Sequence, residues 1–484
     1  MSNAFDGLTD SLVWKSFKSI TEIPRPSKHE EKIIQFMLGW AKENGFEVLQ
    51  DDIQNVVIRI PATPGKENAT TVVLQGHLDM VAEKNNDVEF DFLTQGLNII
   101  RDGDFLTADG TTLGADNGIG VAMAMAVALD KQAIHGPIEL LFTVDEETGL
   151  TGAFELSREI LKGTMLLNID SEEEGFIFVG CAGGTDTTTS LPVAPMELPK
   201  DAEVVDVTLK GLIGGHSGIT IHENRANALK TLATLFHEVI KEHHLHICEF
   251  SGGDKHNAIP RESHAVVAGK PGIRAIIEEK ALTVLEGFKM EFGKLEPNGK
   301  FYFEQAQAAR GLSEADSKNF LHLLLSLPHG VETMSRDIEG MVETSSNLAR
   351  INWLEDKIEF LNSTRSSVAS ALDRVLNRIH AVAEMAGAQA VHGNGYPGWQ
   401  PNMDSKLLKV AREVHKEVLG KDAVITAIHA GLECGIIGEK YPGMEMISIG
   451  PDMFDVHSPD ERLNIPFTDR VYGYLKALLE RIAQ

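Results

Sequence analysis

Histidine and acidic residues follow four apolar segments of the sequence, at the points where the strands of a sheet would end. Residues 71–74, 138–144, 165–168 and 444–449 lead in turn into the strings GHLDM, DEETG, IDSEEEG and GPDMFDVHSP. A further acidic string, GADNG, precedes the apolar stretch 119–129, which is typical of a buried helix. Together the strings supply imidazoles and carboxylates that could hold metal ions or move protons: His77, Asp79, Asp116, Glu146, Glu147, Asp170 and His457.

Each of these residues also has an ordinary structural explanation when it is taken alone. His77 and Asp79 would lie on one face of a strand, where the carboxylate could orient the imidazole, but most isolated His-x-Asp pairs are incidental. Asp116 would cap a helix or occupy an Asn-Gly turn, or it would bridge two cations. Glu146 and Glu147 would be solvated surface, or one would ligate a metal while the other holds a water.

The combination of two histidines and three carboxylates near the predicted strand ends indicates a two-metal hydrolytic site. Two divalent ions would bring four positive charges. The carboxylates of Asp116, Glu147 and Asp170 would bring three negative charges, and a bridging hydroxide would make the cluster neutral. Glu146 is then free to accept a proton from the attacking water and to pass it to the leaving amine.

These residues need a sheet to bring them together. The first third of the chain alternates short apolar runs with amphipathic stretches, which is typical of an α/β layer. The fourth apolar run begins roughly 280 residues after the third ends, and proline- and glycine-rich stretches lie at 191–200 and 393–402. We therefore predict a discontinuous catalytic domain, a mixed sheet flanked by helices, in residues 1–188 and 399–484. A large α+β domain in residues 189–398 would be inserted into it.

The inserted segment contains signs of a duplicated unit. Residues 203–210 form a strand pattern that precedes GGHSG and a helix pattern at 224–241. Residues 357–362 form a second strand pattern that precedes the polar string STRSS and a helix pattern at 367–385. A strand, a polar loop and a long helix are thus expected twice.

Composition indicates an ordinary globular protein. At 484 residues, with ~150 residues per domain, more than one domain is expected, and 43% hydrophobic residues can fill their cores. The three cysteines are far apart, which argues against disulfides and a thiolate zinc site and favours a reducing, cytoplasmic location. The polar N-terminus and the absence of an apolar run of ~18 residues predict neither export nor a membrane span. A net charge of -27 argues against nucleic acid and anionic lipid as partners.

The strings GHLDMV, GADNG, DEETG, NIDSEEEG, GGHSG and HNAIP, in this order, resemble the co-catalytic zinc aminopeptidase, carboxypeptidase and aminoacylase superfamily. The resemblance covers essentially the whole chain, and within the superfamily it is strongest to the branch of aminoacyl-histidine, or cytosolic Xaa-His, dipeptidases. It implies a pair of zinc ions, with cobalt or manganese as substitutes. It also implies roles for seven residues: one metal held by His77, Asp116 and Asp170, the other by Asp116, Glu147 and His457, Asp79 orienting His77, and Glu146 as the general base.

The same resemblance implies that the inserted domain is a lid that closes over the substrate. His216 in GGHSG would stabilise the oxyanion of the transition state. Arg365 in STRSS would grip the C-terminal carboxylate of a short peptide, and Asn257 and Gly431 would make further substrate contacts. Because the lid is duplicated, we expect His216 to act within its own chain.

The expected function is hydrolysis of dipeptides, preferentially Xaa-His and including the β-alanyl-histidine type. Alternatives within the superfamily are an N-acyl amino acid deacylase and a broad-specificity aminopeptidase. A non-enzymatic binding protein is disfavoured because the base and all five metal ligands are present. The expected partner is a small peptide, and the sequence is compatible with a homodimer.

Overall fold

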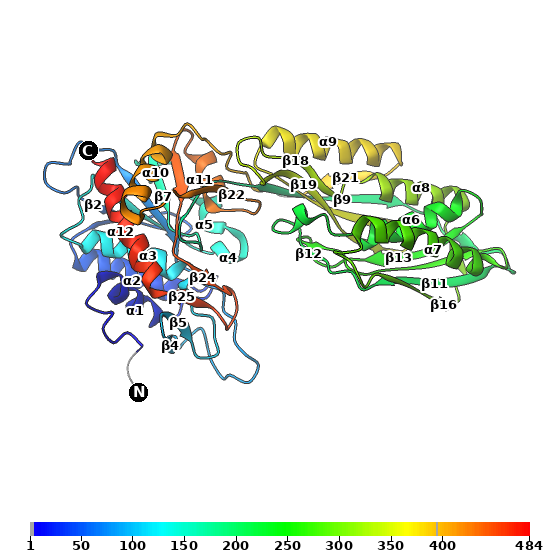
Figure 1. Ribbon diagram of the computed structural model, residues 1–484, viewed down its shortest axis with the longest axis horizontal. Coiled ribbons are helices and arrows are strands. Elements are labelled where there is room, and N and C mark those ends of the chain that lie inside the picture. Colours follow the sequence, from blue (N-terminus) through cyan, green and yellow to red (C-terminus); the bar gives the residue numbers. More distant parts are fainter. Residues whose placement is uncertain (1–3, 394) are drawn as a thin grey trace. The chain divides into compact units, whose positions relative to one another are not determined.

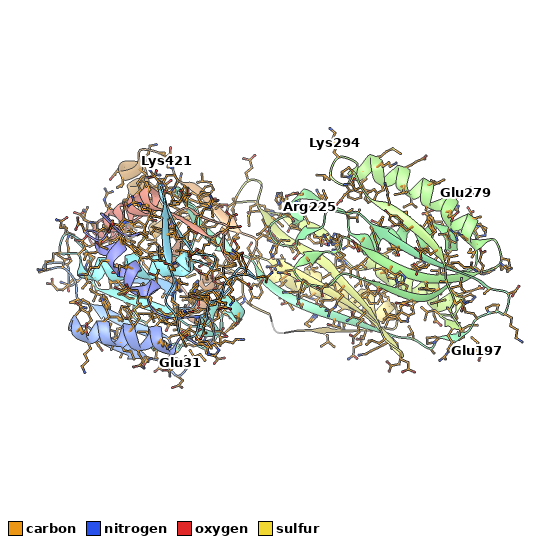
Figure 2. The ribbon with its side chains drawn as sticks, turned by 90° about the horizontal axis from the view of Figure 1, so that it is seen from below. Glu31, Glu197, Arg225, Glu279, Lys294 and Lys421 are labelled. Carbon is orange, nitrogen blue, oxygen red and sulfur yellow. The ribbon has the colours of Figure 1, made fainter. Side chains whose placement is uncertain are left out.

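Two compact units make up the chain (Figure 1). The computed structural model describes residues 4–393 and 395–484, so position 394 of the predicted closing stretch lies outside the described residues. The first unit comprises Met1–Cys181, Trp399–Ala427 and Leu432–Gln484, and the second comprises Ala182–Gly398 and Ile428–Gly431. Exposed charged side chains cover both, for example Glu31 and Lys421 on the first and Glu197 and Lys294 on the second (Figure 2).

The first unit is built on an eight-stranded mixed sheet with the strand order β1-β2-β6-β3-β7-β23-β8-β22. Its central strands β6, β3, β7 and β23 run parallel, and they coincide with the four apolar runs that were predicted to share one sheet. Every residue of β3 and β6 is buried, as expected for strands that are covered on both faces. The strands are β1 (Glu47–Gln50), β2 (Val56–Ile60), β3 (Val72–His77), β6 (Ile138–Thr143), β7 (Met165–Asn168), β8 (Phe176–Cys181), β22 (Val424–Ile428) and β23 (Glu445–Ser448).

Helix α3 (Ala115–Leu129) packs against one face of this sheet at very short range. A Cβ atom on Gly76 of β3 would lie 2.1 Å from the side-chain oxygen of Asn117, so only glycine fits there. Successive side chains of a strand point to opposite faces, so Gln75 points away from α3 and towards α11 (Glu433–Lys440). The other helices are α1 (Leu12–Thr21), α2 (Glu31–Glu43), α4 (Glu146–Gly149), α5 (Thr151–Glu155), α10 (Lys406–Leu419) and α12 (Ile465–Ile482).

A small antiparallel sheet with the order β24-β25-β5-β4 completes the first unit. Its strands are β4 (Ile99–Asp102), β5 (Phe105–Ala108), β24 (Met453–Phe454) and β25 (Arg462–Asn464). His457 lies in the short loop between β24 and β25, so this sheet anchors the loop on both sides.

The second unit is an antiparallel sheet with the order β16-β11-β15-β13-β19-β20-β9-β21, to which β18 adds at β19. Four helices that pack in the sequence α9, α8, α6, α7 form a layer over it (Figure 1). Apolar side chains such as Phe236, Phe250, Phe320 and Phe360 fill the space between. The strands are β9 (Gly183–Pro192), β11 (Glu203–Lys210), β13 (His246–Gly252), β15 (Ser263–Gly269), β16 (Lys300–Gln305), β18 (Gly330–Met334), β19 (Val342–Trp353), β20 (Lys357–Ser366) and β21 (Gln389–His392), and the helices are α6 (Ala228–Ile240), α7 (Ile273–Phe292), α8 (Glu314–Ser326) and α9 (Ala369–Met385).

This sheet contains an internal repeat, in a different arrangement from the predicted one. The segment β11-α6-β13-β15-α7-β16 forms a β-α-β-β-α-β unit in which the strands lie in the order fourth, first, third, second. The set β9-α8-β19-β20-α9-β21 has the same order, and the first unit of the repeat is inserted between β9 and α8. The strand β20 and helix α9 therefore correspond to β15 and α7, and not to β11 and α6 as the sequence pattern suggested.

Two further details differ from the sequence analysis. The string STRSS is not a polar loop, because β20 continues to Ser366 and pairs with β9 over its whole length. The same pairing carries β9 across the predicted boundary between residues 188 and 189, so the sheet and not the proline-rich stretch determines where the second unit begins. None of the helices in the described part of the chain combines the length and the apolar character that a membrane span requires.

Candidate active site

The residues that were predicted to hold metal converge in the first unit at the carboxyl ends of the parallel strands. His77 is the last residue of β3, Asp170 lies two residues beyond β7, and Asp116 lies in the first turn of α3. Glu147 lies in α4, which follows β6, and His457 lies in the loop after β24. Open α/β sheets bind ligands at this edge because the loops that follow adjacent parallel strands meet there.

The carboxylate of Asp116 lies between the two histidines. Nε2 of His77 is 3.0 Å from Oδ1 of Asp116 and 3.4 Å from Oδ1 of Asp170. Nε2 of His457 is 3.0 Å from Oδ2 of Asp116 and 3.1 Å from Oε2 of Glu147. The residues form two trios, His77-Asp116-Asp170 and Asp116-Glu147-His457. In each trio the potential ligand atoms lie within 4.8 Å of one another. The two trios share Asp116, and each of its oxygens faces a different imidazole.

Asp79 connects the end of β3 to the start of α4. Its Oδ1 lies 3.2 Å from Nδ1 of His77 and accepts the backbone N–H of Glu146 at 3.0 Å, and its Oδ2 accepts the N–H of Glu147 at 3.2 Å. Although burial opposes ionisation, these contacts with His77 and Glu146 lower the pKa of Asp79 to about 2. One charged, fully buried carboxylate thus orients an imidazole and the backbone of both glutamates.

Glu146 and Glu147 follow the end of β6, as expected, and form the first turn of the short helix α4. The preceding Asp145 has a φ of 50°, in the left-handed region, so the chain turns sharply between β6 and α4. The side chain of Glu147 is only 5% exposed, so the pair is not a solvated acidic surface. An oxygen of Glu146 also lies within 4.8 Å of ligand atoms of His77 and Glu147, and burial raises its pKa well above the ordinary value.

The charges and unpaired atoms of the cluster fit divalent metal ions. Hydrogen bonds to Asp116 and Glu147 raise the pKa of His457 to about 11, and burial raises that of Asp170 to about 6. Across the described part of the chain, Glu147 Oε1 is buried without any hydrogen-bond partner. Imidazoles mixed with carboxylates are ligands that zinc prefers, and cations would satisfy the buried oxygens and replace protons on the imidazoles.

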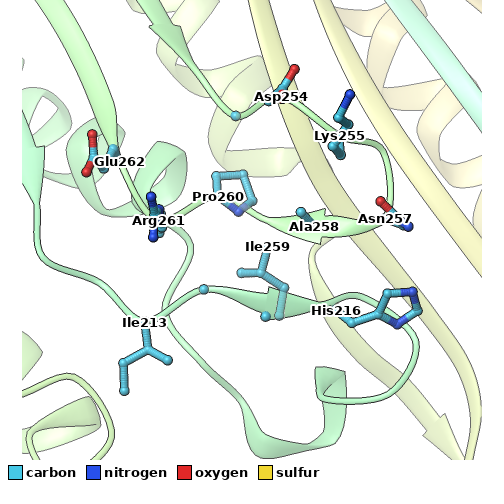
Figure 3. A pocket seen from close by; sticks show the side chains of 13 residues that line it. Ile213, His216, Asp254, Lys255, Asn257, Ala258, Ile259, Pro260, Arg261 and Glu262 are labelled. Atoms are coloured by element: carbon cyan, nitrogen blue, oxygen red, sulfur yellow. The ribbon is translucent and has the colours of Figure 1, made fainter. Parts of the chain in front are cut away.

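The predicted substrate residues all lie in the second unit. His216 is on the short strand β12 (Gly215–His216), which pairs with β14 (Ala258–Ile259) directly after Asn257. Both residues line a pocket of about 600 Å³, and Figure 3 shows their side chains at the same end of it. Nδ1 of His216 accepts the N–H groups of Gly218 and Ile219 at 3.1 and 3.0 Å. Because Nδ1 accepts these two N–H groups, a neutral ring would carry its proton on Nε2. Burial lowers the pKa of His216 below its ordinary value.

Arg365 and Gly431 meet at the same aromatic ring. Arg365 is only 7% exposed, and its guanidinium donates to the hydroxyl of Tyr396 at 2.9 Å. A Cβ atom on Gly431 would lie 2.9 Å from the ring of Tyr396, so a larger residue there would displace the ring. The segment Ile428–Gly431 also brings His429, which had no expected role, to Ser345 at 2.7 Å. Tyr396 and Ser345 were not identified from the sequence, because no motif marks them.

Comparison with known proteins identifies the family of the chain. The sequence profile of Peptidase family M20/M25/M40 matches residues 73–481, which include every residue of the metal-ligand cluster and of the second unit. The chain belongs to this peptidase family.

Individual members of the family extend the match to the whole chain. The chain is 40% identical over 476 residues to the cytosol non-specific dipeptidase of Escherichia coli strain K12, covering 98% of both chains. It is 42% identical to the crystal structure of aminoacylhistidine dipeptidase from Vibrio alginolyticus, with a TM-score of 0.94 over 99% of this chain and 98% of that one. Aminopeptidase PepT from Bacillus cereus, at 16% identity and a TM-score of 0.57 over 98% of both chains, shares the fold.

Two charged residues of this peptidase that sequence reasoning missed hold the backbone around the cluster. Arg25, 1% exposed, donates through Nη1 to the carbonyls of Leu78 and Asp79 at 3.0 and 2.7 Å, and through Nη2 to that of Gly114. Glu461 accepts the backbone N–H groups of residues 113–116 at 2.8 to 3.4 Å. The loops that carry Asp79 and Asp116 are therefore tied to one another. Neither residue belongs to a spacing pattern, so only the structure reveals the contacts.

We expect Glu461→Gln to lower the free energy of unfolding by about 1.5–3 kcal/mol, because the amide puts a donor against backbone N–H groups that now face a carboxylate. Urea denaturation followed by circular dichroism measures the change. Asp460→Asn is a matched control at the neighbouring exposed position, where a change within about 0.5 kcal/mol is expected. Equal stability of the two variants would contradict the role of Glu461.

Proposed function

We propose that the chain is a metallodipeptidase that hydrolyses the peptide bond of dipeptides, with Xaa-His and β-alanyl-histidine types among its preferred substrates. The observation that carries this proposal is the position of Asp116 between His77 and His457, with Asp170 and Glu147 beside them. The names of the relatives support the substrate class, since one is a non-specific dipeptidase and the other an aminoacylhistidine dipeptidase. The two names differ in the range of substrates they imply, so the breadth of specificity is the quantity to measure.

Two divalent cations, zinc or in its place cobalt or manganese, are proposed to bind at this cluster. His77, Asp116 and Asp170 would hold one, and Asp116, Glu147 and His457 would hold the other. When bound, such ions polarise a carbonyl oxygen and make a water nucleophilic near neutral pH.

Glu146 is proposed to accept the proton of the attacking water and to deliver it to the leaving amine. Two observations support this role. Its side chain borders both His77 and Glu147, and burial raises its pKa well above the ordinary value, which favours proton acceptance. Asp79 positions Glu146 through the backbone N–H and orients His77 at the same time.

The second unit is proposed to act as a lid that binds substrate and stabilises the transition state. His216 would donate its Nε2 proton to the developing oxyanion, and the hydrogen bonds to Nδ1 support this role because they leave only Nε2 protonated. Arg365 would bind the substrate carboxylate, with Asn257 and Gly431 as neighbouring contacts. The repeat within this unit supports a lid in which His216 serves its own chain.

Two other activities fit the same cluster. An N-acyl amino acid deacylase or a broad-specificity aminopeptidase would use the same metals and base, and only the groups accepted on either side of the amide bond would differ. The 40% and 42% identities to dipeptidases favour the dipeptidase. A cytoplasmic location is proposed from the name of the cytosol dipeptidase.

We expect the purified chain to hydrolyse His-containing dipeptides and carnosine-like dipeptides faster than tripeptides or N-acetyl amino acids. Reversed-phase chromatography of the products measures the rates. A chelator should abolish them, and Zn²⁺, Co²⁺ or Mn²⁺ should restore them. Preference for N-acetyl amino acids would support the deacylase instead, and turnover that survives complete removal of metal would contradict the proposed function.

Glu146→Gln should lower kcat by about 10²- to 10⁴-fold, the usual contribution of a general base, and leave metal content unchanged. Steady-state kinetics and elemental analysis measure the two effects. Glu155→Gln makes the same substitution at an exposed site on the adjacent helix α5 and should keep wild-type kinetics. Wild-type kcat in Glu146→Gln would refute the assignment of the base.

A further inference from the structure

A chain of hydrogen-bonded polar side chains runs through the core of the first unit beneath the metal-ligand cluster. It consists of Gln75, Thr143, Asn168, Ser448 and Glu433, each at most 1% exposed, and is here called the polar row. A strand core of this kind is normally apolar, since burying polar groups costs free energy unless each is hydrogen-bonded. The polar row therefore requires an explanation beyond packing.

The hydrogen bonds of the polar row link four neighbouring strands. Thr143 Oγ1 and Gln75 Nε2 both donate to Glu433 Oε2, at 2.7 and 2.5 Å. Asn168 Nδ2 donates to Gln75 Oε1 at 2.5 Å, and Ser448 Oγ donates to Asn168 Oδ1 at 2.5 Å. The sheet order β6-β3-β7-β23 contributes one residue from each strand, and α11 contributes Glu433.

Gln75 and Asn168 of the polar row lie one layer beneath His77 and Asp170, on the same face of the sheet. Gln75 pairs with Asn168 across β3 and β7, and Asn168 pairs with Ser448 across β7 and β23. Because side chains alternate along a strand, the next residue on the face of Gln75 is His77. Asp170 lies two residues beyond Asn168 in the same way. The hydrogen bond between Gln75 and Asn168 thus joins the two positions that precede His77 and Asp170 on this face.

Glu433 is the central member because one of its oxygens accepts hydrogen bonds from two strands. Its Oε2 holds the ends of β6 and β3 together just before Glu146 and His77. Its Oε1 has no hydrogen-bond partner in residues 4–393 and 395–484. A buried carboxyl with one unpaired oxygen contributes little to stability. Buried polar groups of this kind are better known for specifying one arrangement of the elements that they join.

We propose that Glu433 is a positioning residue and that the polar row sets the register of the strand ends that carry the metal ligands. The proposal rests on the proposed two-cation site. Removal of the Glu433 carboxyl leaves Gln75 and Thr143 without their shared acceptor, so the strand ends are no longer held in one arrangement. Outer residues that orient metal ligands typically contribute about 10- to 100-fold to metal affinity or activity.

Glu433→Leu and Glu433→Gln separate positioning from packing. The glutamine oxygen can accept both hydrogen bonds, whereas leucine can accept neither. We expect Glu433→Leu to weaken Co²⁺ binding by about 10- to 100-fold, to change the visible absorption spectrum of the Co²⁺ protein and to lower kcat more than it changes KM. Glu433→Gln should restore the affinity and the spectrum of the wild type.

Glu139→Leu is the matched control, because Glu139 is a buried carboxylate at the opposite end of β6 that accepts the N–H groups of Lys162 and Gly163. It should lower the unfolding temperature without altering the Co²⁺ spectrum. Wild-type Co²⁺ affinity in Glu433→Leu, an equal loss in Glu139→Leu, or failure of Glu433→Gln to restore binding would overturn the proposal.

If Glu433→Leu does not fold, Thr143→Val decides the question. It removes one hydroxyl of the polar row and keeps the side-chain shape, so weaker Co²⁺ binding is expected and wild-type binding would contradict the proposal. A wild-type chain that binds Co²⁺ but cleaves no dipeptide would contradict the proposed function and not the role of the polar row.

Discussion

The carboxylate of Asp116 is the contact on which the arrangement of the first unit depends. Its two oxygens face His77 and His457, and His457 lies 341 residues further along the chain. The two imidazoles and the carboxylates of Asp116, Glu147 and Asp170 lie close together, so the negative charges in this volume need positive charge to balance them. The large segment between β9 and β21 separates β7 from β23 along the chain. These two strands are nevertheless neighbours in one sheet, so the contact between Asp116 and His457 can still form.

Successive shells of contacts hold that carboxylate. Asp79 orients His77 and the start of α4, and Arg25 and Glu461 tie the backbone of the Asp79 and Asp116 loops together. The polar row joins the same strands one layer deeper. Ligands fixed by buried charges and hydrogen bonds lose little freedom on binding a cation, which is the physical basis of a preorganised site.

The sequence predicts the parts of this site that depend on local pattern. His77 and Asp170 follow apolar strand runs, and the sheet then brings them together as expected. The pattern could not identify Arg25, Glu461 or Glu433, because their partners are backbone groups or residues from distant segments. It also misassigned the loop STRSS and the pairing of the repeat, since strand continuation and strand order depend on cross-strand hydrogen bonds that local polarity does not reveal.

Anomalous X-ray scattering from crystals grown with Zn²⁺ would decide whether Asp116 bridges two cations. We expect two zinc peaks per chain about 3.5–4 Å apart. Each should lie about 2.0–2.2 Å from a different oxygen of Asp116. A single peak, or two peaks neither of which contacts Asp116, would contradict a bridging role for this carboxylate.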